Sequence, residues 1–240
     1  MKPYQQVPIV ECGEALIAIP LTQFAVEQPH PYVRVAAPYG DKSPYSLRQG
    51  VLDRLLKAQD LLQNEHPNWR IQIFDAYRPL AVQHYMVNYA FAQSLAAKNL
   101  NPDELTEIQR QEILEQVYQF WAIPSYDPTT PPPHSTGAAV DVTLVDARGN
   151  AVEMGSPIDE MSPRSYPNYF VDASEPVTQL FHQNRQLLKQ VMVMAGFRQH
   201  PREWWHFSFG DQVWAWLINE DDPTAQQLAR YGAIEFLHQN

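Results

Sequence analysis

Hydrophobic positions along the chain repeat with two different periods, and each period predicts one kind of element. Apolar residues spaced three to four positions apart are typical of amphipathic helices. This spacing predicts helices over roughly 46–63, from Pro79 to Lys98, from Asn101 to Trp121, and from Ser174 to Gly196. Asn101 is a good N-terminal cap for the third of these helices, and Gly196 stands where a C-terminal cap belongs.

Alternation of apolar and polar residues, together with residues that favour strands, predicts strands between these helices. The strands are expected over 70–77, 139–144 and 205–209. Helices and strands follow one another without a regular βαβ rhythm, which favours an α+β fold with a central antiparallel or mixed sheet flanked by helices. A chain of 240 residues is long enough for one well-cored domain, and we expect a single domain over residues 1–240.

Charge and cysteine content narrow the classes of function. The net charge of -10 argues against nucleic acid as a partner, because phosphate binding needs a basic surface. The single cysteine, Cys12, excludes an intramolecular disulfide and a cysteine-rich metal site. No run of about 18 apolar residues occurs, and the N-terminal segment lacks the pattern of a secretion signal. The expectation is a cytoplasmic protein that does not bind membranes.

The first candidate for chemistry is a histidine and an aspartate seven residues apart. His134 follows the run Pro131–Pro133, and Asp141 lies inside an otherwise apolar predicted strand. An ionisable carboxyl group in such a strand is costly unless it is paired or bound to a cation. An N-cap, an edge residue or half of an ion pair is the ordinary alternative for a lone aspartate, so this segment alone does not decide.

The second candidate is the segment Glu203-Trp204-Trp205-His206. Two histidines and one carboxylate suit Zn²⁺ and leave its fourth tetrahedral position to water, and a second carboxylate beside that water can take its proton. A lone histidine among aromatic residues is more often a hydrogen-bonded core residue. In a straight strand Glu203 and His206 would project to opposite faces, so we expect a bend at Glu203, close to Pro201.

Arg78 is the third candidate, at the end of a predicted strand and directly before Pro79. A guanidinium keeps its charge at neutral pH and can stabilise a developing oxyanion. A surface salt bridge is the alternative that spacing alone favours. Asp75 is interpreted as structural, and the remaining histidines, His30 and His200 among them, as surface or local structural residues.

Taken together, these segments resemble the zinc-dependent D-alanyl-D-alanine dipeptidases of the VanX type, within the hedgehog/DD-peptidase group. The matching motifs are Tyr77-Arg78-Pro79, His134-x-x-Gly137-x-Ala139-x-Asp141 and Glu203-Trp204-Trp205-His206. Further likeness lies in 141–144, 154–156, 159–161 and 164–165. The resemblance covers roughly residues 46–210 and implies a hedgehog/DD-peptidase-like fold and a zinc metallopeptidase activity.

The resemblance also implies roles for individual residues. One Zn²⁺ per chain would be held by His134, Asp141 and His206. Glu203 would be the general base and later the proton donor, and Arg78 would stabilise the oxyanion.

Substrate contacts follow from the same resemblance. Asp159 would hold the free amino group of a dipeptide. The family's serine two residues before the first histidine is Pro132 here, which offers neither a hydroxyl nor an N–H, so Ser135 or Thr136 is expected to take its place.

Two rival functions stay open at this point. A DD-carboxypeptidase or peptidoglycan endopeptidase on the same fold would cut a longer peptide, and Asp159 favours the dipeptidase over it. A zinc-stabilised binding module would need neither Glu203 nor Arg78. The expected partner is a small dipeptide such as D-alanyl-D-alanine, and the oligomeric state is left open.

Overall fold

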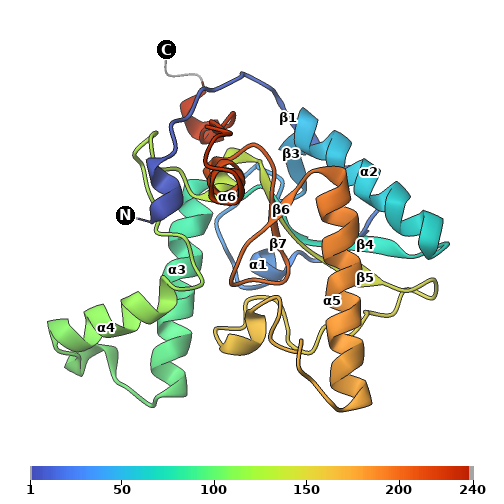
Figure 1. Cartoon of the computed structure of the whole chain (residues 1–240). Coiled ribbons are helices and arrows are strands. Elements are labelled where there is room, and N and C mark those ends of the chain that lie inside the picture. The colour runs from blue at the N-terminus through green and yellow to red at the C-terminus, as the bar shows by residue number, and fades with distance from the viewer. Residues whose placement is uncertain (1, 238–240) are drawn as a thin grey trace.

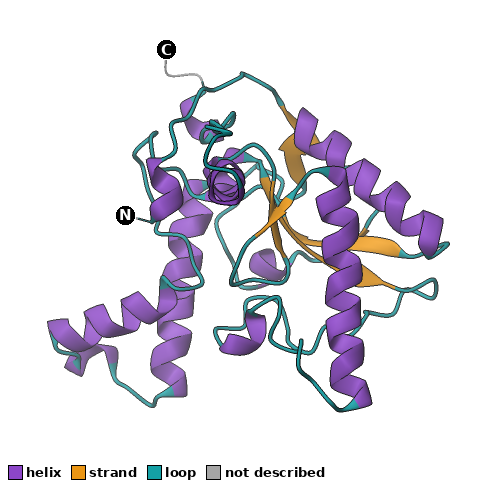
Figure 2. Cartoon of the chain, in the orientation of Figure 1, coloured by secondary structure: helices purple, strands orange, loops and turns teal. Residues whose placement is uncertain are grey.

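A five-stranded sheet forms the centre of the protein in the computed structural model, which describes residues 2–237 (Figure 2). Its order is β2–β4–β5–β7–β6. The strands are β2 (Ala25–Val26), β4 (Arg70–Asp75), β5 (Ala139–Val145), β7 (His206–Ser208) and β6 (Arg198–Gln199). β2 runs parallel to β4 and the other neighbours are antiparallel, so the expected α+β fold with a mixed sheet is confirmed. Met1 and residues 238–240, the ends of the predicted 1–240 domain, lie outside the described residues.

A second, two-stranded sheet pairs β1 (Leu16–Ala18) with β3 (Ser46–Arg48) in antiparallel fashion. The prediction of a helix beginning near residue 46 was therefore wrong at its start, because these three residues pair with β1. The helix α2 begins only at Gln49 and ends at Glu65.

Two long helices cover one face of the central sheet (Figure 1). They are α2 and α5 (Pro176–Ala195). Between them and the sheet lies the main apolar core, with Val140, Val142 and Leu144 of β5 fully buried against residues such as Leu55 and Leu188. Gly196 ends α5 with φ of 110°, a left-handed value, so the predicted C-terminal cap is confirmed.

The helices α3 (Leu80–Ala97) and α4 (Glu107–Val117) extend to the other side of the molecule (Figure 1). A single helix over 101–121 was a wrong prediction. Asn101 caps only the short 3₁₀ turn Pro102–Glu104, and Thr106 then forms a new capping box that starts α4. A second apolar cluster packs α3 and α4 against Tyr32 and Trp121.

The remaining helical elements are short. They are α1 (Pro31–Arg34), α6 (Gln212–Asp221) and the 3₁₀ turns η1 (Pro3–Gln6), η2 (Pro102–Glu104), η3 (Pro133–Thr136), η4 (Pro163–Ser165) and η5 (Ile234–Phe236). Across residues 2–237, no helix has both the length and the apolar character needed to cross a membrane.

Candidate active site

Three neighbouring strands bring two aspartates and a histidine side by side. Asp141 of β5 pairs directly with His206 of β7, and Asp75 of β4 pairs with Asp141 from the other side. The β4–β5 register shifts between Ile73 and Asp75. Such a bulge re-aims a side chain, and here it turns Asp75 to the face of Asp141 rather than to the core face of Ile73.

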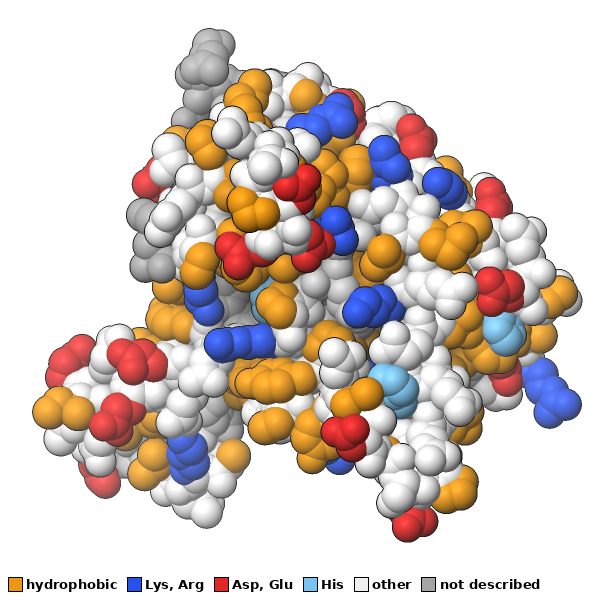
Figure 3. All heavy atoms as spheres, in the orientation of Figure 1, with side chains coloured by type: hydrophobic (Ala, Val, Ile, Leu, Met, Phe, Trp, Pro, Cys, Tyr) orange, Lys and Arg blue, Asp and Glu red, His pale blue; other side chains and the backbone are white. Residues whose placement is uncertain are grey.

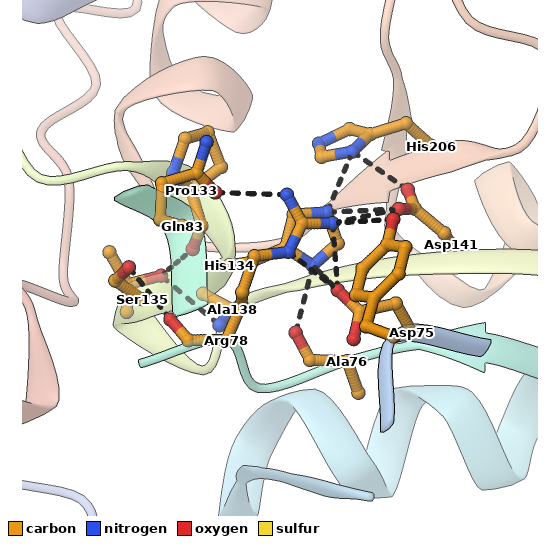
Figure 4. Close-up of polar contacts among 12 residues, drawn as sticks. Asp75, Ala76, Arg78, Gln83, Pro133, His134, Ser135, Ala138, Asp141 and His206 are labelled. Atoms are coloured by element: carbon orange, nitrogen blue, oxygen red, sulfur yellow. Dashed lines mark hydrogen bonds and ion pairs between the residues drawn. The ribbon is translucent and has the colours of Figure 1, made fainter. Parts of the chain in front are cut away.

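His134 reaches the same face from η3, which lies directly before β5 in the chain. Gly137 ends η3 with φ of 70°, a left-handed value that favours glycine, and a Cβ there would have to displace the Leu16 Cδ1 methyl group 2.7 Å away. The His134 Nδ1–H donates to the carbonyl oxygen of Ala76 at 2.8 Å (Figure 4). In the neutral ring this bond keeps the proton on Nδ1, so the lone pair of Nε2 is directed towards Asp141.

The donor atoms of His134, Asp141 and His206 fit a tetrahedral metal ion. His134 Nε2 lies 3.2 Å from His206 Nδ1 and 3.3 Å from Asp141 Oδ2, and His206 Nδ1 lies 3.0 Å from Asp141 Oδ1. Zinc bonds of about 2.0–2.2 Å at tetrahedral angles separate the donors by about 3.3 Å. All three residues are buried and their donor atoms lie within 4.8 Å of one another.

The charge state of Asp141 suits a metal ligand. Burial alone would raise the pKa of this carboxyl group, but His134 and His206 outweigh burial and hold the pKa well below its usual range. Asp141 is therefore an anion at neutral pH, even though it is 2% exposed.

A hydrogen-bonded chain behind His206 fixes its orientation. His206 Nε2 lies 3.3 Å from Ser208 Oγ, and the Ser208 hydroxyl donates to Asp211 Oδ2 at 2.9 Å. Since Ser208 donates its own proton to Asp211, its oxygen accepts the Nε2–H of His206. The lone pair of Nδ1 is therefore free to bind a metal ion, an arrangement typical of metal-bound histidines.

Glu203 lies in the loop just before β7, so the expected bend is present. Its carboxylate oxygens lie 3.8 Å from His206 Nδ1 and 3.7 Å from His200 Nδ1. Burial raises the pKa of Glu203 well above its ordinary value, and the nearby Asp141 and Asp159 add to the rise. A carboxyl group with a raised pKa is suited to taking up and releasing a proton near neutral pH.

Arg78 is buried, and the alternative of a surface salt bridge is wrong. Its Nε donates to Asp75 Oδ2 at 2.9 Å, its Nη1 donates to Gln83 Oε1 at 2.9 Å, and its Nη2 lies 3.5 Å from Asp141 Oδ2 (Figure 4). Burial works to lower the pKa of Arg78, but Tyr32, Asp75 and Asp141 outweigh it and raise the pKa. The guanidinium is thus a permanent cation beside the metal-binding group.

Asp75 has a larger role in the site than its sequence context indicated. It is completely buried and lies within 3.5 Å of His134 Nδ1 and 3.2 Å of His30 Nε2. Tyr39 also donates to it, at 3.2 Å. This carboxylate holds Arg78 and stabilises the ring of a predicted metal ligand at once.

Asp159 and Ser135, the two predicted substrate contacts, have different surroundings. Asp159 borders the site and accepts a hydrogen bond from Tyr32 at 2.8 Å, and desolvation together with Asp141 raises its pKa to about 7. Ser135 is fully buried, and its hydroxyl donates to the carbonyl oxygen of Arg78 at 2.8 Å. Asp159 lines the cavity described next, whereas Ser135 is not among its lining residues, and its contact with substrate stays a prediction.

A cavity of about 300 Å³ opens onto His134, Asp141 and His206. Besides the predicted site residues, it is lined by side chains that the sequence did not point to, including Lys2, Trp121, His200 and Arg202. His200 could have been found from its place just upstream of Glu203, but Lys2 lies at the far end of the chain with no motif around it. Figure 3 shows a recess on this face of the molecule, with lysine and arginine side chains around it.

Residues 25–226 match the peptidase family described as D-Ala-D-Ala dipeptidase. The chain belongs to the D-Ala-D-Ala dipeptidase family. It is 48% identical to the D-alanyl-D-alanine dipeptidase of Synechocystis sp. over 98% of each chain. It is 34% identical to the D-alanyl-D-alanine dipeptidase of Escherichia coli over 49% of this chain and 61% of that one.

Among solved structures, the vancomycin resistance D,D-pentapeptidase VanY is similar with a TM-score of 0.45 and 14% identity, over 74% of this chain and 80% of that chain. The resemblance read from the sequence motifs is confirmed by family membership. As a member of the D-Ala-D-Ala dipeptidase family, the chain is a metallopeptidase, and the alternative of a non-catalytic binding module was wrong.

Proposed function

We propose that this chain hydrolyses D-alanyl-D-alanine with one zinc ion held by His134, Asp141 and His206. The observation that carries the proposal is the set of three buried donor atoms at tetrahedral spacing, with Glu203 on their open side. The 48% identity to a D-alanyl-D-alanine dipeptidase supports the choice of substrate.

The residues around the metal position divide the chemistry between them. When bound, zinc supplies Lewis acidity, which polarises a carbonyl group and makes water a stronger acid. Glu203 takes the proton of the attacking water and later delivers it to the departing amine, a double role that its raised pKa favours. The Arg78 guanidinium, held rigid by Asp75 and Gln83, stabilises the negative charge that develops on the carbonyl oxygen.

Asp159 selects for a free amino terminus in this proposal. Its carboxylate borders the cavity and is oriented by Tyr32, so it can pair with the ammonium group of a dipeptide. A longer peptide would place a neutral amide there and leave the carboxylate without a cation. This penalty favours a dipeptidase over a DD-carboxypeptidase or endopeptidase.

The experiment that tests the proposal compares three substrates with the zinc-loaded chain. Release of D-alanine is measured from D-Ala-D-Ala, L-alanine from L-Ala-L-Ala, and terminal D-alanine from an N-acetylated tripeptide ending in D-Ala-D-Ala. Hydrolysis of D-Ala-D-Ala well above the other two is expected. Preferred cleavage of the capped tripeptide would instead identify a carboxypeptidase, and no hydrolysis of any substrate would reject the proposed activity.

Two broader expectations remain proposals. A single domain over residues 1–240 is supported by the family match over residues 25–226 and by contacts of η1, near the N-terminus, with α6. A cytoplasmic location is proposed on the sequence pattern alone.

A further inference from the structure

The carboxylate end of the substrate has no assigned partner among the predicted site residues. A free dipeptide carries an ammonium group at one end and a carboxylate at the other. Asp159 suits the ammonium end. At the other end, Pro132 has no hydroxyl, and the hydroxyl of Ser135 already donates to the backbone carbonyl oxygen of Arg78. A binding site for both ends therefore needs a further cation in the cavity.

Arg78 is not that cation, because its charge is shared with two buried carboxylates and the proposed mechanism uses it to stabilise the carbonyl oxygen of the bond that is cleaved. Its Nε, Nη1 and Nη2 atoms bond to Asp75, Gln83 and Tyr32, and Asp75 and Asp141 lie close enough to balance its charge. A guanidinium that lies between two carboxylates and also serves the scissile carbonyl group has little capacity for a further carboxylate.

Lys2 and Arg202 line the same cavity and differ from Arg78 in how their charges are balanced. Within residues 2–237, neither has a carboxylate oxygen within 4.0 Å of its cationic nitrogens. The Lys2 ammonium donates one hydrogen bond, to the carbonyl oxygen of Tyr118 at 2.7 Å. An ammonium has three N–H donors, so two remain for a ligand.

The ammonium group of Lys2 lies near Arg202 and Glu203, and its lowered pKa shows that keeping its positive charge costs free energy. Burial lowers its pKa, the positive charge of Arg202 lowers it further, and Glu203 acts in the opposite direction. Two cations that repel each other at the wall of a cavity bind an anion favourably, because the anion relieves both the repulsion and the desolvation.

We propose that Lys2, assisted by Arg202, binds the C-terminal carboxylate of the dipeptide. This inference rests on the proposed function and adds the specificity-determining group for the carboxylate end. Asp159 and Lys2 then recognise the two charged ends of one zwitterion. A peptide that continues beyond the second residue would lack a carboxylate at Lys2, so the pair limits substrates to two residues.

The position of Lys2 depends on how the start of the chain is held. Directly after it, η1 packs on α6, and Gln212 of α6 donates to the backbone carbonyl of Val7 at 2.7 Å. The bond from Lys2 to Tyr118 connects this segment to the end of α4. The N-terminal segment is thus one wall of the active site, and the protein for any test must carry no N-terminal tag.

The test compares D-Ala-D-Ala with D-alanyl-D-alaninamide, which has no carboxylate. Lys2→Met removes the charge and keeps the chain length, Lys2→Arg restores the charge, and Lys57→Met removes an exposed lysine of α2 as the matched control. For D-Ala-D-Ala we expect Lys2→Met to raise KM about 10-fold or more, with kcat changed far less. We expect KM for the amide to stay the same, Lys2→Arg to recover most of the loss, and Lys57→Met to match the wild type.

An unchanged KM for D-Ala-D-Ala in Lys2→Met would overturn the inference. An equal rise in KM for D-alanyl-D-alaninamide would overturn it as well. Binding of D-Ala-D-Ala to the zinc-loaded Glu203→Gln chain, with and without Lys2→Met, is measured by titration calorimetry. This second readout decides the role of Lys2 even if the wild-type chain fails to cleave D-Ala-D-Ala. Such a failure would reject the proposed function alone, whereas equal dissociation constants would reject Lys2 alone.

Discussion

The chain of hydrogen bonds behind His206 predicts that a serine outside the cavity controls zinc affinity. Ser208→Ala removes the oxygen that lies 3.3 Å from His206 Nε2 and that is itself held by Asp211. The substitution leaves the three proposed metal ligands, His134, Asp141 and His206, in place. It also leaves the bond that the Trp214 N–H donates to Asp211 Oδ1 at the start of α6, so the helix cap is preserved.

The size of the effect follows from the burial of His206. The residue is 5% exposed, so an Nε2–H without an acceptor loses a hydrogen bond that water does not readily replace. An unsatisfied buried donor costs about 1–3 kcal/mol, which corresponds to about 5- to 150-fold in an equilibrium constant. The ring can avoid this cost by moving its proton to Nδ1, which competes directly with metal binding. We therefore expect zinc affinity to fall about 10- to 100-fold.

Competition with a chromophoric chelator measures this affinity in the purified chain. Ser94→Ala is the matched control, because the Ser94 hydroxyl bonds only to a helix carbonyl in α3, and it should leave the affinity unchanged. At saturating zinc the Ser208→Ala variant should hydrolyse D-Ala-D-Ala with a kcat near that of the wild type. Zinc affinity equal to that of the wild type would refute the assigned tautomer of His206 and the role of Ser208.

Three further predictions concern the carboxylates of the site. Glu203→Gln should keep one zinc per chain by elemental analysis while kcat falls at least about 100-fold, and near-normal activity would contradict its role as the base. Asp75→Asn should lower the free energy of unfolding in urea by about 3 kcal/mol or more, because it leaves buried Arg78 without its main partner; a loss below about 1 kcal/mol would argue against this. In the metal-free chain, the raised pKa of Asp159 means that the folded state holds a proton that the unfolded state releases at lower pH. Stability should therefore fall as pH rises from about 4 to about 7, and Asp159→Asn should make that slope shallower in denaturant titrations at pH 5 and pH 8; equal slopes would count against it.

Much of the fold could be predicted from local patterns, and the errors have physical causes. The periodicity of α2 and α5 is strong because each buries one face against a large partner, whereas α3 is apolar over most of its surface. All three helices were found with small errors at their ends. The short strands β1, β2 and β6 have two or three residues each, too few to show alternation. β3 was assigned to a helix because its pairing with β1 depends on residues about 30 positions away.

Within the site, the sequence by itself determined the chemistry that depends on residue type. Two histidines and a carboxylate for zinc, Glu203 outside a straight strand, and Arg78 could be proposed from motifs, because few side chains can bind a metal or keep a permanent charge. The surroundings of these groups could not be predicted this way. Whether Arg78 forms a surface salt bridge or a buried pair depends on burial, which no local pattern reports.

The tertiary structure alone decided which other residues enter the site. The bulge in β4 turns Asp75 away from the core face that simple alternation would assign to it, and the register of β5 with β7 sets His206 beside Asp141. Lys2 reaches a cavity whose proposed metal ligands lie more than 130 positions along the chain. Residue type can be read locally, whereas proximity between distant segments is set by how the whole chain packs.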